Sequence, residues 1–213
     1  MSKDRNVFID DDLVIVGQRA SIDPAALLGY RTGRRIIQGK LVIGECATVR
    51  SGTVIYLASV IGDRLETGHG VVIREENQIG DDFQIWNNSV IDYGCTIGNN
   101  VHIHTNVYVA QFSILEDGVF LAPGVTIAND IHPGCELSRQ CMRGPHLEQN
   151  VRVGINATLL PFVRIGYGAL IGSGAVVTQD VPPMAVCVGN PGRIIKQTSE
   201  LRCFTKRCTW PYC

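Results

Sequence analysis

An aliphatic residue returns at every sixth position along most of the chain. The series begins at Ile37 and holds to Ile127, with one lapse at Thr67. After an interruption at about residues 131 to 146 it resumes, two residues out of register, over residues 147 to 177. A period of six fits neither the 3.6-residue repeat of a helix nor the two-residue alternation of an ordinary strand. The pattern therefore predicts an internal repeat that governs the whole fold.

Turn-forming residues separate the aliphatic anchors. The hexads read IGECAT, IGDDFQ, IGNNVH, LAPGVT and IGSGAV, so Gly, Asn or Asp follows most anchors. These residues adopt positive φ at low cost, which allows a corner in each hexad. Short strands separated by regular corners indicate an all-β fold, a parallel β-helix.

The repeats resemble those of the hexapeptide-repeat acyltransferase superfamily over roughly residues 14 to 197. The resemblance implies a left-handed parallel β-helix of triangular section, with three hexads per coil, against the usual right-handed crossover. It also implies homotrimers with active sites between subunits. We expect a β-helix domain over residues 1–188 with a loop insert at about 131–146, and a C-terminal extension, 189–213, that forms a short helix or tail.

Composition narrows the partners and the compartment. Apolar residues make up 45% of the chain, charged residues 18%, and the formal net charge is -1, which argues against nucleic acid as a partner. No apolar run approaches the ~20 residues of a membrane span, and Met1 to Asn6 do not form a signal sequence. We expect no membrane insertion and a cytoplasmic location. Three of the eight cysteines, Cys46, Cys95 and Cys187, stand singly, which favours reduced thiols.

The segment from Ile165 to Lys196 ends in a Gly-Asn-Pro-Gly turn followed by basic residues. It resembles the last coil of coenzyme A-dependent acetyltransferases, which implies acetyl-CoA as a cosubstrate. Backbone exposed at glycines and alanines would meet the pantetheine arm, and basic side chains would meet phosphates. The alternative is that the segment only caps the solenoid. The expected coenzyme contacts are Gly154, Asn156, Ala157, Gly172, Ser173, Ala175, Arg193 and Lys196.

Residues 67 to 130 resemble bacterial sugar N-acetyltransferases that acylate nucleotide-linked sugars. Asn106, in IHTNVYVA, occupies the place of an Asn that approaches the sugar amine in those enzymes. A neutral amide can accept a hydrogen bond from an amine without adding a charge. Alternatively, Asn106 and Asn88, eighteen residues apart, form a stacked ladder that satisfies the turns. The further expected substrate contacts are Glu75, Glu76, Trp86 and Asn88.

Acyl transfer to an amine needs a place for the proton. His69 and His104 are the predicted bases, with Glu75 or Glu76 orienting the imidazole of His69. Either histidine could instead be structural, His69 as a turn residue and His104 stacked on Trp86. Some members of the family use no protein base.

The insert HPGCELSRQCMRGPH brings two thiols and two imidazoles within fifteen residues. His132, Cys135, Cys141 and His146 are therefore predicted ligands of a tetrahedral structural zinc ion, with reduced surface cysteines as the alternative. Cys203, Cys208 and Cys213 recur in the basic C-terminal tail and indicate no function.

The predicted activity is transfer of an acetyl group from acetyl-CoA to a nucleotide-linked amino sugar, in cell-surface glycan biosynthesis. The alternatives are a trimeric scaffold and a γ-type carbonic anhydrase. The latter needs a pair of histidines about five residues apart, which His102 and His104 are not. Outward aromatic residues on the prism favour a homotrimer. They are predicted to be Phe83, Trp86, Tyr108 and Phe112.

Overall fold

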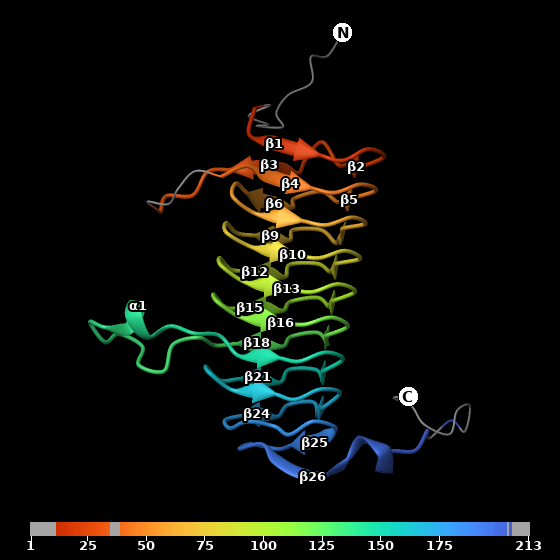
Figure 1. Cartoon of the computed structure of the whole chain (residues 1–213), viewed down its shortest axis with the longest axis vertical. Coiled ribbons are helices and arrows are strands. Elements are labelled where there is room, and N and C mark those ends of the chain that lie inside the picture. Colours follow the sequence, from red (N-terminus) through yellow and green to blue (C-terminus); the bar gives the residue numbers. More distant parts are fainter. Residues whose placement is uncertain (1–11, 35–38, 204, 206–213) are drawn as a thin grey trace.

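The computed structural model describes residues 12–34, 39–203 and 205. Its chain winds into a prism whose three walls are sheets of parallel strands, a left-handed β-helix (Figure 1). In the described part, helical structure is confined to α1 (Ser138–Cys141) and the 3₁₀ turn η1 (Thr198–Glu200). The predicted all-β fold is confirmed. No described helix has the length and apolar character needed to cross a membrane.

Most strands are only two residues long, because a corner follows each one. From β1 to β24, every third strand joins the same sheet, so consecutive strands lie on different walls. Sheet A contains β1 (Val14–Val16), β4 (Leu41–Ile43), β7 (Val60–Ile61), β10 (Gln78–Ile79), β13 (Thr96–Ile97), β16 (Ile114–Leu115), β19 (His146–Leu147) and β22 (Arg164–Ile165). Sheet B contains β2 (Ser21–Ile22), β5 (Thr48–Val49), β8 (Glu66–Thr67), β11 (Gln84–Ile85), β14 (His102–Ile103), β17 (Phe120–Leu121), β20 (Arg152–Val153), β23 (Leu170–Ile171), β25 (Ala185–Val188) and β26 (Arg193–Gln197). Sheet C contains β3 (Leu27–Tyr30), β6 (Val54–Tyr56), β9 (Val72–Ile73), β12 (Val90–Ile91), β15 (Tyr108–Val109), β18 (Thr126–Ile127), β21 (Thr158–Leu159) and β24 (Val176–Val177).

The strand register follows the eighteen-residue spacing of three hexads. Gln84 pairs with His102, and Val90 pairs with Tyr108, each eighteen positions further along. Across the insert, Ile114 pairs with His146, so the additional residues leave the sheet order undisturbed. The stacking predicted from the repeat is confirmed in all three walls.

Each hexad buries two side chains, the second strand residue and the residue two positions before it. Ile85 and Phe83 are both fully buried. The prediction that Phe83 faces outward is therefore wrong. Its neighbour Asp82 has a φ of 56°, and this left-handed corner turns the next side chain into the prism. Trp86 is half-buried, while Tyr108 and Phe112 are exposed, as expected.

Three edges run along the prism, and we name each by the sheets it joins. The A–B corner links each sheet-A strand to the next sheet-B strand. The B–C corner links each sheet-B strand to the next sheet-C strand, and the C–A corner links sheet C to sheet A. Two long loops leave the prism, between β3 and β4 and between β18 and β19. Both leave at the C–A corner, on the same side of the molecule (Figure 1).

The C-terminal extension forms a strand where a helix was expected. The Gly-Asn-Pro-Gly turn connects β25 to β26, which pair antiparallel. β25 extends sheet B by parallel pairing with β23, and its free edge then accepts β26. The 3₁₀ turn η1 follows, and the expected short helix or tail did not include the strand β26. Cys208 and Cys213 lie outside the described residues.

Candidate functional site

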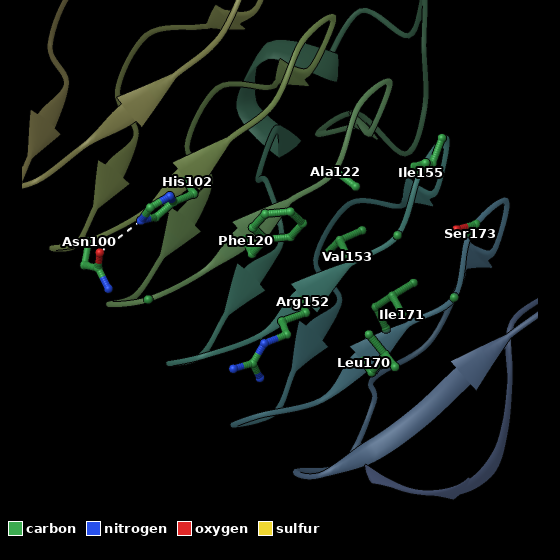
Figure 2. Close-up of a pocket in the computed structure, with 13 residues that line it drawn as sticks. Asn100, His102, Phe120, Ala122, Arg152, Val153, Ile155, Leu170, Ile171 and Ser173 are labelled. Atoms are coloured by element: carbon green, nitrogen blue, oxygen red, sulfur yellow. Dashed lines mark hydrogen bonds between the residues drawn. The ribbon is translucent and has the colours of Figure 1, made fainter. Parts of the chain in front are cut away.

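A groove of about 620 Å³ runs along the outer face of sheet B. Its floor consists of His102, Phe120, Arg152 and Leu170, the outward residues of β14, β17, β20 and β23. Figure 2 shows these four side chains on successive strands. Since adjacent strands lie about 4.8 Å apart, the floor extends about 14 Å along the prism.

One wall of the groove follows the B–C corner and carries few long side chains. A Cβ added at Gly154 would lie 2.6 Å from the backbone nitrogen of Ser173, a contact that no side chain could relieve. Gly172 is similarly tight, with a Cβ placed 2.7 Å from Val188 Cγ1. Glycine at these positions lets the coils approach and keeps the wall low. The wall contains Ala122, Gly154, Ile155, Gly172 and Ser173.

The groove is mainly apolar and carries one fixed positive charge. Asn100, His102 and Arg152 supply its principal polar side chains, and no described Asp or Glu lines it. The Nη1 atom of Arg152 donates to the backbone oxygen of Asn150 at 3.2 Å. Such a groove suits an elongated, largely neutral ligand with an anionic portion.

The structure brings three of the predicted coenzyme contacts together. Gly154, Gly172 and Ser173 all line the groove. Asn156 is exposed on the same corner, with a φ of 55°. The predicted residues at this corner therefore form one continuous strip.

Two further predicted contacts point into the prism. Ala157 and Ala175 are fully buried. Their backbone N–H groups donate to the carbonyls of Gly154 and Gly172, at 3.3 and 3.2 Å. The prediction of a surface role for both alanines is wrong, because each occupies the inward position two residues before an anchor.

The predicted basic residues lie on the last strand of sheet B. Arg193 is exposed and pairs with Val188, and Lys196 is partly exposed and pairs with Val186. Their strand follows β25, which itself adjoins β23 at the end of the groove. The C-terminal end of sheet B is therefore its cationic end.

The predicted amine-binding and catalytic residues lie on the B–C corner, in coils that precede the groove or meet its beginning. Asn88 and Asn106 occupy left-handed corners, with φ of 57° and 59°. His104 packs its ring edge-on against Phe120, with centroids 5.1 Å apart. Trp86 lies one coil earlier, where the Arg50 guanidinium is 5.5 Å from its ring centroid. His104 therefore contacts Phe120, a residue of the groove floor, where stacking on Trp86 was the expected structural alternative.

His69 lies further along the same corner and is exposed. Its Nδ1 is 2.8 Å from Ser51 Oγ, and its backbone N–H donates to Asn87 Oδ1 at 2.8 Å. Glu75 and Glu76 do not orient it, because they lie at the next corner of the coil and bind arginines. That part of the sequence prediction is wrong, since six residues carry the chain from one edge to the next.

The C–A corner contains an ionic cluster around the buried Glu75 and Asp92, which we call the charged corner: Thr32, Arg34, Arg74, Glu75, Glu76, Asp92, Tyr93, Tyr108 and Gln111. The side chain of Glu75 is fully buried, and its Oε1 lies 3.0 Å from both Arg34 Nη1 and Arg74 Nη2. Thr32 donates to the same oxygen at 2.9 Å. Arg34 also stacks on Tyr93, 3.6 Å from the ring centroid. Burial would raise the pKa of Glu75, but hydrogen bonds from its own backbone, Arg74, Arg34 and Thr32 lower it overall.

Asp92 continues this network. Arg74 Nη1 lies 3.3 Å from its Oδ1, and Tyr108 donates to its Oδ2 at 2.8 Å. Burial, together with the hydrogen bond to Asp92, raises the pKa of Tyr108. The charged corner is therefore internally satisfied, and Glu75 and Glu76 serve the fold where substrate contact was predicted.

The four predicted zinc ligands do not converge. His132, Cys135 and Cys141 are exposed in or beside the α1 loop. His146 belongs to β19, and its Nε2 lies 2.7 Å from Glu116 Oε1. No group of three or more His, Cys, Asp or Glu residues in the described chain could hold a metal ion. The zinc prediction is not supported, because the strand register removes His146 from the loop.

Sequence reasoning missed the floor of the groove. His102, Phe120 and Arg152 share one outward column, which the eighteen-residue spacing reveals once the insert is allowed for. Asn100 was missed because its link to His102 runs across the A–B corner, two residues away.

Comparison with known proteins supports the repeat and the fold. The model of the bacterial transferase hexapeptide, with six repeats, matches residues 78–111 and 94–129. A 2,3,4,5-tetrahydropyridine-2,6-dicarboxylate N-acetyltransferase from Staphylococcus aureus is 50% identical over 56 residues, which are 26% of this chain and 23% of that enzyme. The match therefore spans about a quarter of the curated relative.

Two solved structures are similar to this chain. A Bacillus cereus protein described as a candidate acetyltransferase is 20% identical, with a TM-score of 0.54 over 81% of this chain and 84% of that one. A hexapeptide-repeat acetyltransferase from Vibrio cholerae is 24% identical, with a TM-score of 0.48 over 55% and 71%. The Bacillus cereus structure supports the β-helix fold.

Proposed function

We propose that this chain is a member of the hexapeptide-repeat superfamily and that it transfers an acetyl group from acetyl-CoA to the amino group of a nucleotide-linked sugar. The observation that carries the proposal is the groove on sheet B. It combines a glycine-lined wall, imidazoles at one end and a cationic strand at the other. The product would serve cell-surface glycan biosynthesis.

The groove fits the chemistry of the coenzyme. Gly154 and Gly172 keep the wall low, so that an amide-rich arm can approach the backbone. Arg152, Arg193 and Lys196 lie along the C-terminal half of sheet B, where they can bind phosphates. This arrangement directs the thioester toward β14, where His102 and His104 lie. Bound acetyl-CoA would supply an activated carbonyl at that end.

The acceptor amine would approach along the B–C corner. Asn106 is exposed there and precedes the groove in the stack of coils. Its neutral amide can accept a hydrogen bond from the amine and hold the nitrogen lone pair toward the thioester. Trp86 and Asn88, one coil further away, offer a flat ring and a second amide to the rest of the sugar.

Transfer to nitrogen is also supported by the Staphylococcus aureus relative, whose name denotes an N-acetyltransferase. Its matched segment is 50% identical, although it is a quarter of that enzyme. The dicarboxylate in that name is the second acceptor to test, after the nucleotide-linked amino sugars.

The active assembly in this proposal is a cytoplasmic homotrimer. The groove lies on an outer face of the prism, and Ile155 at its edge is 49% exposed. An exposed apolar edge beside a ligand groove favours coverage by a neighbouring subunit. Sedimentation that gives a fully active monomer would contradict this part.

A thiol-release assay tests the activity. Acetyl-CoA is offered with a panel of UDP-, GDP- and dTDP-linked amino sugars, with the matching hydroxyl sugars as controls. We expect acceptor-dependent thiol release with at least one amino sugar and none with its hydroxyl analogue. Absence of release with every amine would contradict the proposed activity.

A further inference from the structure

The floor of the groove contains a histidine whose ring is already oriented. His102 is the outward residue of β14, between Gln84 of β11 and Phe120 of β17. Its Nε2 lies 3.0 Å from the side-chain oxygen of Asn100 (Figure 2). The ring is therefore held from the A–B corner, and His102 itself lines the groove.

The hydrogen bond to Asn100 defines the tautomer. An amide oxygen can only accept a hydrogen bond, so Nε2 carries the hydrogen. In a neutral imidazole, Nδ1 is then the acceptor. No described residue donates to Nδ1. His102 thus presents an unshared lone pair from the floor of a largely apolar groove.

The nearby charges do not block that nitrogen. On the side of β11, Asp82 is the closest acidic group, and hydrogen bonds from Arg64 occupy it and lower its pKa. On the other side, Phe120 separates His102 from Arg152, which lies two strands away. An acid limb in a pH profile would therefore be attributable to the imidazole, with Asp82 and Arg152 as its charged surroundings.

We propose that His102 accepts the proton of the attacking amine, with Asn100 as the positioning residue that holds it in the Nε2–H form. This inference rests on the proposed acetyl transfer and names its base. In the step, the amine nitrogen forms a bond to the thioester carbonyl carbon, and the carbon–sulfur bond breaks. The amine proton passes to Nδ1 of His102. The departing thiolate then takes a proton from the imidazolium, which restores the neutral ring.

His102 is better placed for this role than the histidines singled out by sequence. His104 packs against Phe120, and no hydrogen bond to a described residue fixes its tautomer. His69 is exposed and its Nδ1 is engaged with Ser51. His102 alone among these three lines the groove.

The chain offers a matched control. His146 also precedes a buried anchor on a two-residue strand, and its Nε2 also lies close to a polar oxygen, that of Glu116. It lies on sheet A, outside the groove. His102→Gln should lower kcat about a hundredfold, with the Kd for acetyl-CoA within about twofold of the unsubstituted chain. His146→Gln should leave both within about twofold.

Asn100→Gly tests the positioning role. The backbone φ of Asn100 is 53°, which glycine tolerates, so the change removes the amide with little strain. We expect kcat to fall about fivefold to tenfold while KM stays unchanged. In ¹⁵N spectra of the free chain, the His102 ring should show the Nε2–H tautomer, and Asn100→Gly should produce a mixture.

The outcomes distinguish a failure of His102 as the base from a failure of the proposed acetyl transfer. The decrease of kcat/KM at low pH, its acid limb, should disappear in His102→Gln and persist in His146→Gln. If the unsubstituted chain turns over and His102→Gln keeps its rate and its acid limb, His102 is not the base. If the free ring shows the Nδ1–H form, the inference is equally overturned. If the unsubstituted chain acetylates no amine at all, the proposed activity fails first and the role of His102 with it.

Discussion

The groove and the charged corner occupy the same prism but treat polar groups in opposite ways. At the charged corner, Glu75 is fully buried and bonds to Thr32, Arg34 and Arg74. In the groove, the Nδ1 of His102 has no described donor, and the wall carries mostly small residues. Both regions are built from the same hexads, so the repeat itself does not decide which edge binds a ligand.

This difference distinguishes polar residues that stabilise the fold from polar residues that are available to a ligand. A buried charge whose partners are all within the chain stabilises a local arrangement, in this case the attachment of the loop that follows β3. A polar group left with spare hydrogen-bonding capacity beside a cavity is available to a ligand. Substitutions should therefore affect stability at one corner and binding or turnover at the other.

The largest effect is expected at the charged corner. Glu75→Gln removes the carboxylate that Arg34 and Arg74 share and leaves them only Glu76 and Asp92 as counter-charges, and breaking a buried pair costs about 3 to 5 kcal/mol. We expect a loss near the lower bound in the free energy of unfolding, because both arginines keep partial exposure, 35% and 29%. Urea denaturation measures it.

Glu66→Gln is the matched control. Glu66 pairs with Arg50 at 2.8 Å, with side chains 33% and 34% exposed, so its loss should cost about 1 kcal/mol or less. Acetyl-CoA affinity should be unchanged in folded Glu75→Gln protein. Equal destabilisation by the two changes would contradict the distinction between the corners.

The second effect concerns turnover at the B–C corner. Asn106→Gly should lower kcat about tenfold to a hundredfold, the equivalent of one hydrogen bond to a reacting group. Asn88→Gly should lower it less, because the proposed function assigns the amine contact to Asn106 alone. Glycine avoids the strain that alanine would suffer at φ of 59° and 57°. Equal losses in steady-state assays would favour the stacked-ladder interpretation.

The third effect concerns binding at the groove wall. Gly172→Ala should weaken acetyl-CoA binding about tenfold, or 1.4 kcal/mol, because a methyl group would raise the wall. Its Cβ would meet the end of the Val188 side chain, which can rotate away, so the fold should survive. Calorimetry measures the affinity.

Gly134→Asn in the α1 loop serves as its control. Gly134 has a φ of 84° and nothing within 4 Å of an added Cβ. Asn tolerates such a φ, so neither stability nor affinity should change. Unaltered binding in Gly172→Ala would remove this glycine from the proposed site.

The smallest effect is a pH dependence of stability. The pKa of Glu75 is lower in the folded chain than in the unfolded one, so the unfolded state takes up its proton at higher pH. The contribution is complete above the ordinary glutamate range, about pH 4.3, and disappears as the pH falls through the folded value. Unfolding free energies between pH 6 and pH 3 should fall less steeply in Glu75→Gln.

The fold was largely predictable because one period encodes it. The anchors and the eighteen-residue columns follow from the spacing of aliphatic residues, and the strand pairs agree. Phe83 was misplaced because the inward position before each anchor depends on the left-handed corner, and not on hydrophobicity alone. The strand β26 after the Gly-Asn-Pro-Gly turn was not predicted, because it forms on the free edge of β25.

The site was less predictable. Gly154, Gly172 and Ser173 came from a local motif and do line the groove. The floor could not be recognised in the same way, because its residues come from four coils and share no local motif. The zinc ligands illustrate the converse, since sequence proximity placed His146 with cysteines that the strand register keeps away.

Both long loops leave and re-enter the prism at the same edge. The C–A corner is therefore the place where this fold accommodates inserted residues. Because the strands on either side keep their partners, an inserted segment there costs little more than its own closure entropy. Gly134 has open space around it, so a peptide tag or a small reporter domain can be inserted there. The same tolerance lets descendants of such a solenoid acquire new appendages without redesigning the groove on the opposite wall.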